Sequence, residues 1–274
     1  MVKIAYILLC HGNIEPIKRL ITQILESDTN CAIVVHYDKR DSSDHYLELK
    51  ASYSGSRCHF LSDADRVQGE WGTFGLVQAV LNAFDYIKES SLGCSHCYLI
   101  SGSCYPLRPL YELNEYLGVN RGLNFIECQG SDWIRGGIKK DRYFYHHVLS
   151  KRKYPKLFRW IYLAQKRLGL KRIGATSMQV YFGSQWWCLT WESVSKIVEY
   201  AKSDKRFVKF FRTVWIPDEC FFQTAVRQLC DPEKIADRSL TYYEFDKKGK
   251  PRYFAKNEIA CDILRNYFFI RKYH

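Results

Sequence analysis

The chain has 274 residues, of which 47% are hydrophobic and 16% aromatic, and its formal net charge is +12. This length suffices for one substantial core, with at most a small appendage. No run approaches the ~20 apolar residues of a membrane-spanning helix, which argues against an integral membrane protein. The first ten residues predict a strand rather than a signal peptide, so we expect the chain to stay in the cytoplasm.

The positive charge is concentrated in one segment, residues 139–172. This segment holds twelve lysines and arginines but a single acid, Asp141, and the rest of the chain is nearly neutral. A segment of this kind favours contact with phosphates, which a nucleic acid, an anionic membrane surface or a lipid diphosphate would offer.

The eleven cysteines are odd in number and lie mostly in apolar, strand-like runs. This pattern favours buried, reduced thiols over a disulfide framework. One CxxC motif spans residues 94–97, but a zinc site would need two more ligands at a suitable spacing. A loop that leads into a strand is therefore favoured over a zinc site there.

The first half of the chain alternates strands and helices. Strands are predicted at residues 3–10, 31–38, 58–61, 96–101 and 124–128, and helices at residues 14–25, 74–87 and 110–117. This alternation predicts an α/β sheet with right-handed crossovers, in which ligands bind at the carboxyl ends of the strands. His11, Asp38 and residues 101–104 should therefore lie along one edge.

In the second half, a basic and tyrosine-rich stretch interrupts the pattern. Residues 154–170 predict a helix with Leu157, Trp160, Ile161 and Leu168 on one side. That side could seek a membrane surface or pack on its own domain, and the sequence leaves both open. A strand at 180–190 and helices at 192–201 and 220–229 follow. Without repeats or a linker, we expect one domain over residues 1–274.

Eight segments, in order, carry a family resemblance. They are IAYILLCHGN, VVHYDKR, EWGTFGLVQA, LISGSCYPL, NFIE, FGSQWWCLT, IPDECFFQT and FIRKY. On them, nearly the whole chain resembles the core-2/I-branching β-1,6-N-acetylglucosaminyltransferase and xylosyltransferase family, glycosyltransferase family 14, in a short, bacterial-looking form. The resemblance implies a GT-A type α/β fold whose mostly parallel central sheet is flanked by helices. Residues 1–128 would form the nucleotide-binding half, and residues 129–274 the acceptor and catalytic half.

The same resemblance implies an inverting transfer of N-acetylglucosamine or another hexose from a UDP-sugar to a glycan hydroxyl. The acceptor would be a glycan, in bacterial surface polysaccharide synthesis. The basic segment motivates a further hypothesis, that the acceptor is a lipid-linked oligosaccharide reached at the inner membrane face. LISGSCYPL occupies the place where metal-dependent relatives carry Asp-x-Asp, so no metal or other cofactor is expected. Asp63-Ala64-Asp65 falls elsewhere, where a loop with helix-capping acids is favoured over a manganese site.

Inverting displacement of a nucleotide diphosphate needs a base for the acceptor proton and positive charge for the leaving group. Glu219 matches the family base. From the residues alone, Asp218 and Glu219 could instead merely favour the dipole of the helix that follows Pro217. The resemblance overturns that reading and leaves Asp218 in a supporting position.

Fixed cations would replace the metal at the diphosphate. Lys272 matches a family lysine that contacts it. The resemblance implies a second cation at the diphosphate, an arginine, and Arg238 fits one version of its motif. Many relatives place that arginine where this chain has Thr241. Arg271 and Arg252 are therefore the alternatives.

Other positions follow from the resemblance at the nucleotide and acceptor sides. Asp38 would contact the nucleoside; His11 and His36 flank it and are favoured as structural residues. Ser101, Gly102 and Ser103 would approach the diphosphate. The resemblance implies that Glu127 grips acceptor hydroxyls, that Gly183 and Ser184 allow close approach of the donor sugar, and that sugar platforms come from Trp133 and from one of the adjacent Trp186 and Trp187.

Two other functions remain open at this level. The basic segment with its tyrosines is compatible with a nucleic-acid-binding protein, although no recognised nucleic-acid motif is present. A metal-dependent glycosyl- or nucleotidyltransferase would use Asp63 and Asp65, and its activity would require a divalent cation.

Overall fold

The structure is a computed structural model that describes residues 2–134, 136–172, 178–246, 250–255 and 258–273. Its central sheet has the strand order β3-β2-β1-β4-β6. The first four strands are parallel and β6 is antiparallel to β4. The strands are β1 (Ile4–Cys10), β2 (Ala32–Tyr37), β3 (Cys58–Phe60), β4 (His96–Ser101) and β6 (Cys188–Thr190). The predicted α/β class with a mostly parallel sheet is therefore confirmed.

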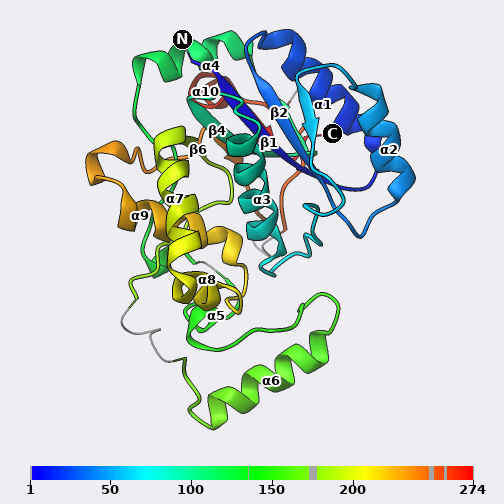
Figure 1. Ribbon diagram of the computed structural model, residues 1–274. Coiled ribbons are helices and arrows are strands. Elements are labelled where there is room, and N and C mark those ends of the chain that lie inside the picture. The colour runs from blue at the N-terminus through cyan, green and yellow to red at the C-terminus, as the bar shows by residue number, and fades with distance from the viewer. Residues whose placement is uncertain (1, 135, 173–177, 247–249, 256–257, 274) are drawn as a thin grey trace.

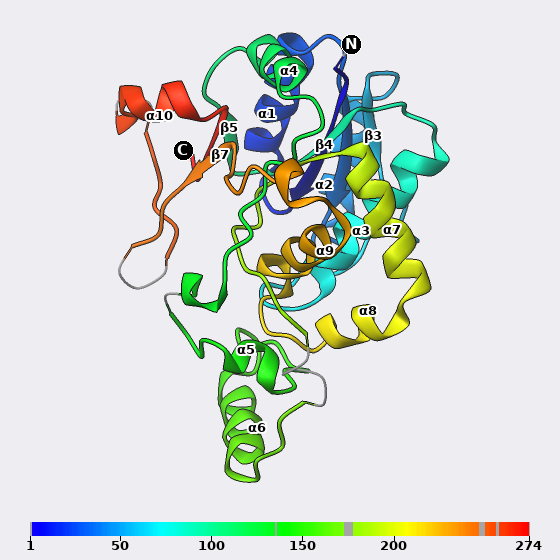
Figure 2. The same cartoon turned by 90° about the vertical axis from the view of Figure 1, so that its left-hand side faces the viewer.

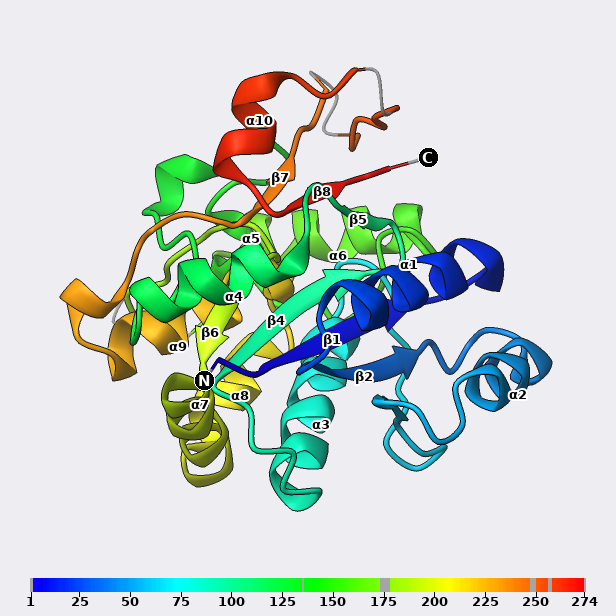
Figure 3. The same cartoon turned by 90° about the horizontal axis from the view of Figure 1, so that it is seen from above.

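Both faces of the sheet are covered by helices, as Figure 3 shows. Alternate residues of β1 point into two cores, with Ile7 on one side and Tyr6 on the other. One face packs against α3 (Gly75–Glu89), α7 (Trp191–Ser203) and α9 (Phe221–Leu229), and the other against α1 (Ile14–Ser27) and α4 (Leu110–Val119). Burial on both faces explains why the central strands are continuous apolar runs.

A second, three-stranded sheet has the order β5-β8-β7. It consists of β5 (Cys104–Pro106), β7 (Thr241–Tyr243) and β8 (Phe269–Arg271). Phe268 and Phe269 are buried and hold this part of the chain against the domain. The backbone N–H of Tyr273 donates to the carbonyl oxygen of Ser103 at 3.1 Å. The residues after β8 therefore lie beside the loop that follows β4.

The basic segment extends away from the sheets. It contains the short helix α5 (Asp141–Phe144) and the longer α6 (Pro155–Arg167). Figures 1 and 2 both show α6 at one end of the molecule, away from the central sheet. Phe158 joins α6 to the domain, because its ring lies 5.8 Å from that of Trp215.

Two predicted strands are largely wrong. Residues 124–128 and 180–190 run through the middle of the molecule, but only Cys188–Thr190 forms a strand. The rest pair through isolated bridges, such as Phe125 with Cys188 and Gln129 with Phe182. Their apolar side chains are buried in the cores, which explains why their sequence resembles that of a strand.

Several helices lack a strong periodic pattern and were not predicted. They are α2 (Ser43–Ser52), α8 (Lys205–Phe211) and α10 (Cys261–Asn266). All eleven cysteines are free and ten are buried, in agreement with the prediction of reduced thiols. The Sγ atoms of Cys94 and Cys97 lie 3.9 Å apart at the start of β4. In the described part of the chain, no helix combines the length and apolarity that a membrane crossing requires.

Replacement of Phe84 tests the packing of the larger core, which lies between the sheet and helices α3, α7 and α9. It is fully buried between Trp187 and Phe222, at ring distances of 5.8 and 6.0 Å. We expect Phe84→Ala to lower the free energy of unfolding by about 3–5 kcal/mol, because the lost contacts leave a cavity. Urea denaturation measures the change, with Leu47→Ala on the exposed surface of α2 as the control, expected within ~0.5 kcal/mol of the parent. A loss below ~1 kcal/mol for Phe84→Ala would contradict this packing.

Candidate active site

The carboxyl ends of the parallel strands form one edge of the sheet. Cys10 is paired with Tyr37, and Leu9 with Ser101. His11, Asp38 and Gly102 follow these strands directly, so the structure brings them to the same edge, as the sequence predicted. The backbone N–H of Gly102 donates to the carbonyl oxygen of Leu9 at 3.1 Å, which holds this loop against β1.

Asp38 is a buried carboxylate with several donors. It accepts from Nη2 of Arg40 at 2.7 Å and from the backbone N–H of Gly69 at 3.1 Å. Burial raises its pKa, but these donors outweigh burial, so the pKa of Asp38 lies below its usual value. It is therefore a fixed, ionised acceptor at the edge where a nucleoside would bind.

The two histidines near this edge differ in burial. His36 is buried, and its Nε2 atom accepts a hydrogen bond from the Val67 amide at 3.0 Å. Burial lowers the pKa of His36 to about 4, so it stays neutral. His11 is exposed beside Asp41. The structure therefore gives His36 the structural position that the sequence favoured.

The segment before Glu219 has an unusual backbone. Ile216 is left-handed, with φ 58° and ψ 60°, a conformation that is costly for a β-branched residue. Two hydrogen bonds hold it there, from the Trp215 amide to the Arg142 carbonyl at 3.0 Å and from the Ile216 amide to the Gly72 carbonyl at 3.1 Å. Pro217–Glu219 then forms one turn of 3₁₀ helix. Strain of this kind, held by surrounding contacts, is typical of functional sites.

Glu219 forms an ion pair with Arg142, with Oε2 and Nη1 2.6 Å apart. The side chains are 21% and 10% exposed respectively, so the pair is partly shielded from water. Burial raises the pKa of Glu219 and the Arg142 guanidinium opposes this rise; the net direction is upward. A carboxylate whose pKa is raised toward neutrality is a better proton acceptor than a free one.

No sequence pattern indicated Arg142 as a site residue. It is one of twelve cations in the basic segment, of which Arg142 and Arg172 are buried. The contact with Glu219 distinguishes Arg142. Its neighbour Tyr143 is also buried, but an aromatic residue beside a cation is no signal of burial here, because Tyr154 and Trp160 also follow cations and are exposed.

Glu127 also lies close to Glu219. It accepts from the Tyr243 hydroxyl at 2.8 and 3.0 Å and from the Ser184 amide at 2.8 Å. The charge of Glu127 contributes to the raised pKa of Glu219. The two carboxylates are therefore neighbours, and Tyr243 is a site residue that sequence reasoning missed.

Gly183 is required at this point for a steric reason. A Cβ atom there would lie 2.1 Å from the Glu127 carbonyl oxygen. The Gly183 amide donates to the carbonyl oxygen of Glu219 at 3.0 Å. The missing side chain therefore lets the chain's own backbone bring Glu127 and Glu219 together. The approach of a donor sugar at Gly183 stays a prediction.

Asp218 is buried beside the ion pair. Burial, and then the neighbouring Glu219, raise its pKa to about 7, and the Arg142 and Arg271 cations oppose the rise. Its Oδ1 atom is buried without a hydrogen-bond partner within the described residues. Asp218 is therefore a buried carboxyl group next to Glu219, and its supporting role stays a prediction.

The predicted diphosphate cations separate into two groups. Lys272 and Arg271 follow each other at the end of β8, and the Lys272 amide donates to the Arg252 carbonyl at 3.3 Å. Lys272 Nζ lies 3.3 Å from the Tyr253 hydroxyl. Arg238 is not with them: it donates to the carbonyl of Asn266, before β8 begins. Of the candidate arginines, Arg271 and Arg252 are therefore next to Lys272 and Arg238 is at the opposite end of the strand.

The tryptophans differ in their exposure to solvent. Trp187 is fully buried, and Trp186 is only 4% exposed, with the Arg271 guanidinium over its ring at 4.6 Å. Neither ring is open to solvent. Trp133 is half-buried against the larger core. Trp71, which sequence reasoning did not select, is 41% exposed and packs edge-on against Trp215 at 5.9 Å, next to the strained Ile216.

Asp63 and Asp65 make contacts within their own loop. Asp63 pairs with the Arg66 guanidinium, and Asp65 accepts from the Ser62 hydroxyl at 2.5 Å. Over the described ranges, no three His, Cys, Asp or Glu side chains gather as metal ligands would.

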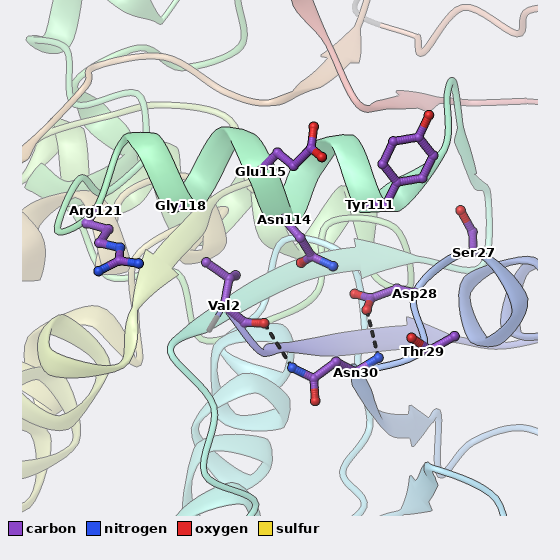
Figure 4. A pocket seen from close by; sticks show the side chains of 10 residues that line it. All are labelled: Val2, Ser27, Asp28, Thr29, Asn30, Tyr111, Asn114, Glu115, Gly118 and Arg121. Atoms are coloured by element: carbon purple, nitrogen blue, oxygen red, sulfur yellow. Dashed lines mark hydrogen bonds between the residues drawn. The ribbon is translucent and has the colours of Figure 1, made fainter.

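Two cavities lie outside this cluster. One, of about 300 Å³, is at the amino-terminal edge of the sheet, between Asp28 and Asn114. Figure 4 shows it, including the hydrogen bond from Asn30 to the Val2 carbonyl. The other, of about 580 Å³, lies between residues 131–141 and α6 and is lined by Lys139 and Lys166. Only the second borders the segment that contains Arg142.

Comparison with known proteins identifies the class to which this fold and site belong. Residues 4–268 match the family described as "Branch: Core-2/I-Branching enzyme". The chain belongs to this family and is a glycosyltransferase. The mostly parallel sheet with helices on both faces is the architecture expected for it.

The chain is similar to xylosyltransferases from animals. It is 27% identical to xylosyltransferase 2 of Homo sapiens over 255 residues, and 23% identical to xylosyltransferase oxt of Drosophila pseudoobscura pseudoobscura over 253 residues. Each match covers 90% of this chain but only 27% of the relative, so the chain spans about a quarter of their length. One solved structure, of a glucose-1-phosphate thymidylyltransferase from Bacillus anthracis in complex with sucrose, has a TM-score of 0.34 at 15% identity. The match covers 73% of this chain and 75% of that one, and the likeness is too low to carry an argument.

The burial of Asp218 predicts a pH-dependent stability. Because its pKa in the folded state is about 7, against about 3.9 in an unfolded chain, the folded state keeps a proton that the unfolded state releases. Stability should therefore fall as pH rises from 4 to 7, by up to roughly 4 kcal/mol, and Asp218→Asn should remove this fall.

Urea denaturation of the parent and Asp218→Asn at several pH values measures the difference. Buried histidines such as His36 act in the opposite direction, because their lowered pKa costs stability in acid, but they are common to both proteins. Asp231→Asn, at an exposed position, is the control. Parallel pH profiles for the parent and Asp218→Asn would contradict the proposed protonation of Asp218.

Proposed function

We propose that the chain transfers a sugar from a UDP-sugar to a carbohydrate hydroxyl with inversion, without a bound metal ion. The observation that carries this proposal is the partly buried Glu219 carboxylate, held by Arg142 close to the Glu127 and Asp218 carboxylates. Membership of a glycosyltransferase family supports it independently.

In the proposed reaction, Glu219 is the catalytic base. It accepts the proton of the acceptor hydroxyl while that oxygen attacks the anomeric carbon from the face opposite the diphosphate. The bond from the anomeric carbon to the diphosphate oxygen breaks, and its electron pair leaves with UDP. Arg142 is a positioning residue, because its 2.6 Å contact orients Glu219 and favours the ionised form that can accept the proton.

Positive charge for the leaving diphosphate comes from Lys272 and Arg271 in this proposal. Arg271 ends β8 and Lys272 follows it, and the adjacent Tyr273 is hydrogen-bonded to Ser103 in the loop after β4, next to Ser101 and Gly102. Fixed cations aimed at a developing negative charge lower the barrier without reorganisation at the moment of reaction. Arg252 is the further candidate, and the position of Arg238 does not support a part in this step.

The remaining groups would hold the two substrates. Asp38, with His11 beside it, faces the nucleoside side. Glu127 would accept hydrogen bonds from the acceptor sugar. The exposed ring of Trp71 is a platform of the kind on which a sugar ring packs, and we add it to Trp133 as a candidate. Trp186, at 4% exposure, offers no such platform.

We propose N-acetylglucosamine or another hexose as the donor sugar, and xylose, which the names of the relatives indicate, belongs to the same screen. The proposed acceptor is a glycan or a lipid-linked oligosaccharide of a bacterial surface polysaccharide, used at the cytoplasmic face of the inner membrane. A panel of UDP-sugars, tested for hydrolysis and for thermal stabilisation of the protein, would identify the donor.

Glu219→Gln tests the base directly. We expect turnover to fall by roughly 10²–10⁴-fold, because the amide cannot accept the proton, while UDP affinity stays nearly unchanged. Initial rates with the best donor of the panel measure turnover, and calorimetry with UDP measures affinity. Glu199→Gln, on the exposed surface of α7, is the matched control and should behave as the parent does. Comparable turnover in Glu219→Gln would remove Glu219 from the mechanism.

Lys272→Ala tests the source of positive charge. We expect UDP affinity to fall by roughly tenfold to a hundredfold, the usual size of a lost hydrogen bond to a charged group. Lys209→Ala, at an exposed position on α8, is the control. EDTA should leave the transfer rate of the parent unchanged. If EDTA abolished turnover and manganese restored it, a divalent cation would be the source of the charge and the metal-dependent alternative would be favoured.

A further inference from the structure

The outward side of α6 is apolar and exposed. Leu157 and Trp160 are 47% and 69% exposed, and Leu168, just after the helix, is 69% exposed. These positions share one side of a helix, because a turn takes 3.6 residues. Large apolar side chains grouped on one exposed surface are uncommon unless that surface binds a partner.

The inward side of α6 already has its contacts. Phe158 is buried and stacks on His147 at 5.1 Å, and the Tyr162 hydroxyl donates to Asp141 at 2.5 Å. Gln165 donates to the His146 carbonyl at 2.9 Å. The helix is therefore docked on the domain by one side, while Leu157, Trp160 and Leu168 are left on the other. Of the two possibilities that the sequence left open, packing on the domain accounts for only the side that contains Phe158.

Exposed cations surround the apolar side. Lys153, Lys156 and Arg167 are exposed, and the single acid of the segment, Asp141, is already paired with Lys166 at 3.0 Å. A partner for this surface must therefore be negatively charged as well as apolar. A second copy of the chain does not meet this requirement, since it would present the same cations.

We propose that this surface, the outward side of α6 with its surrounding cations, binds an anionic lipid bilayer. A helix with apolar side chains on one side and lysines and arginines around them lies in the interface of such a bilayer, with the leucines and tryptophan among the acyl chains. A single-stranded nucleic acid would use the cations and aromatic rings, but it gives no role to exposed leucines.

The contact would also place the active site relative to the membrane. Phe158 packs on Trp215, which directly precedes the strained Ile216 and the turn that carries Glu219. The lipid-bound helix and the candidate base are thus linked through two adjoining residues. This inference goes beyond the proposed reaction, and lipid binding can be measured without any turnover.

Vesicle co-sedimentation of the full chain tests the proposal. The probes are vesicles of phosphatidylcholine alone and vesicles in which roughly a third of the lipid is phosphatidylglycerol, at low salt. We expect binding to the anionic vesicles only. Lys153→Gln/Lys156→Gln should weaken it about thirtyfold, since each cation near the surface contributes about 1 kcal/mol. Leu157→Ser/Trp160→Ser should weaken it at least about tenfold, because the apolar anchors are lost.

Matched controls separate this surface from general effects. Lys205→Gln/Lys209→Gln on α8 and Leu47→Ser/Val119→Ser, both at exposed positions, should bind as the parent does. Transfer to a soluble acceptor, measured in parallel, should be unchanged in the α6 variants, so a failure of lipid binding and a failure of the proposed reaction are distinguishable. No binding of the parent to anionic vesicles, full binding by both α6 variants, or tight filter binding of single-stranded RNA without vesicle binding would each overturn the proposal.

Discussion

The ion pair between Arg142 and Glu219 joins parts of the chain that no sheet connects. Arg142 lies in the basic segment, and Glu219 follows a left-handed Ile216 that is held by backbone hydrogen bonds on either side. A partly buried pair gains little stability overall, but removing one partner leaves the other charge uncompensated. Position, rather than stability, is therefore what this contact provides. The basic segment belongs to the site through Arg142 and faces outward through most of its other cations.

The charged groups around this pair are sorted by sign. Carboxylates of Glu127, Asp218 and Glu219 lie together, whereas Arg271 and Lys272 come from the end of β8. In the proposed reaction a proton leaves the acceptor and negative charge grows on the diphosphate, so this arrangement matches the direction in which charge moves. Two sheets are needed for it, because the large sheet supplies the edge and the small sheet supplies the cations.

Sequence patterns predicted the strands and helices that build the two cores. The strands β1, β2 and β4 contribute side chains to both cores and are therefore continuous apolar runs. The helices α1 and α3 each contribute to one core and are therefore periodic, so all these patterns are strong. Residues 124–128 and 180–190 misled the prediction because buried, irregular segments have the same apolar character. Arg142 could not be distinguished from eleven similar cations, since tertiary packing alone decides which of them turns inward. Arg238 was favoured by its motif, yet the strand register puts it at the opposite end of β8 from Lys272.

The place of β8 between β5 and β7 affects how the site is assembled. Its two neighbours lie far apart in sequence, and each of the three strands has only three residues, so few backbone hydrogen bonds hold them together. A nucleotide that touched both the loop after β4 and the end of β8 would act as a clamp across this small sheet. Its binding free energy would add to the cohesion of the last strand, so that occupied molecules would resist local opening of that strand more than empty ones.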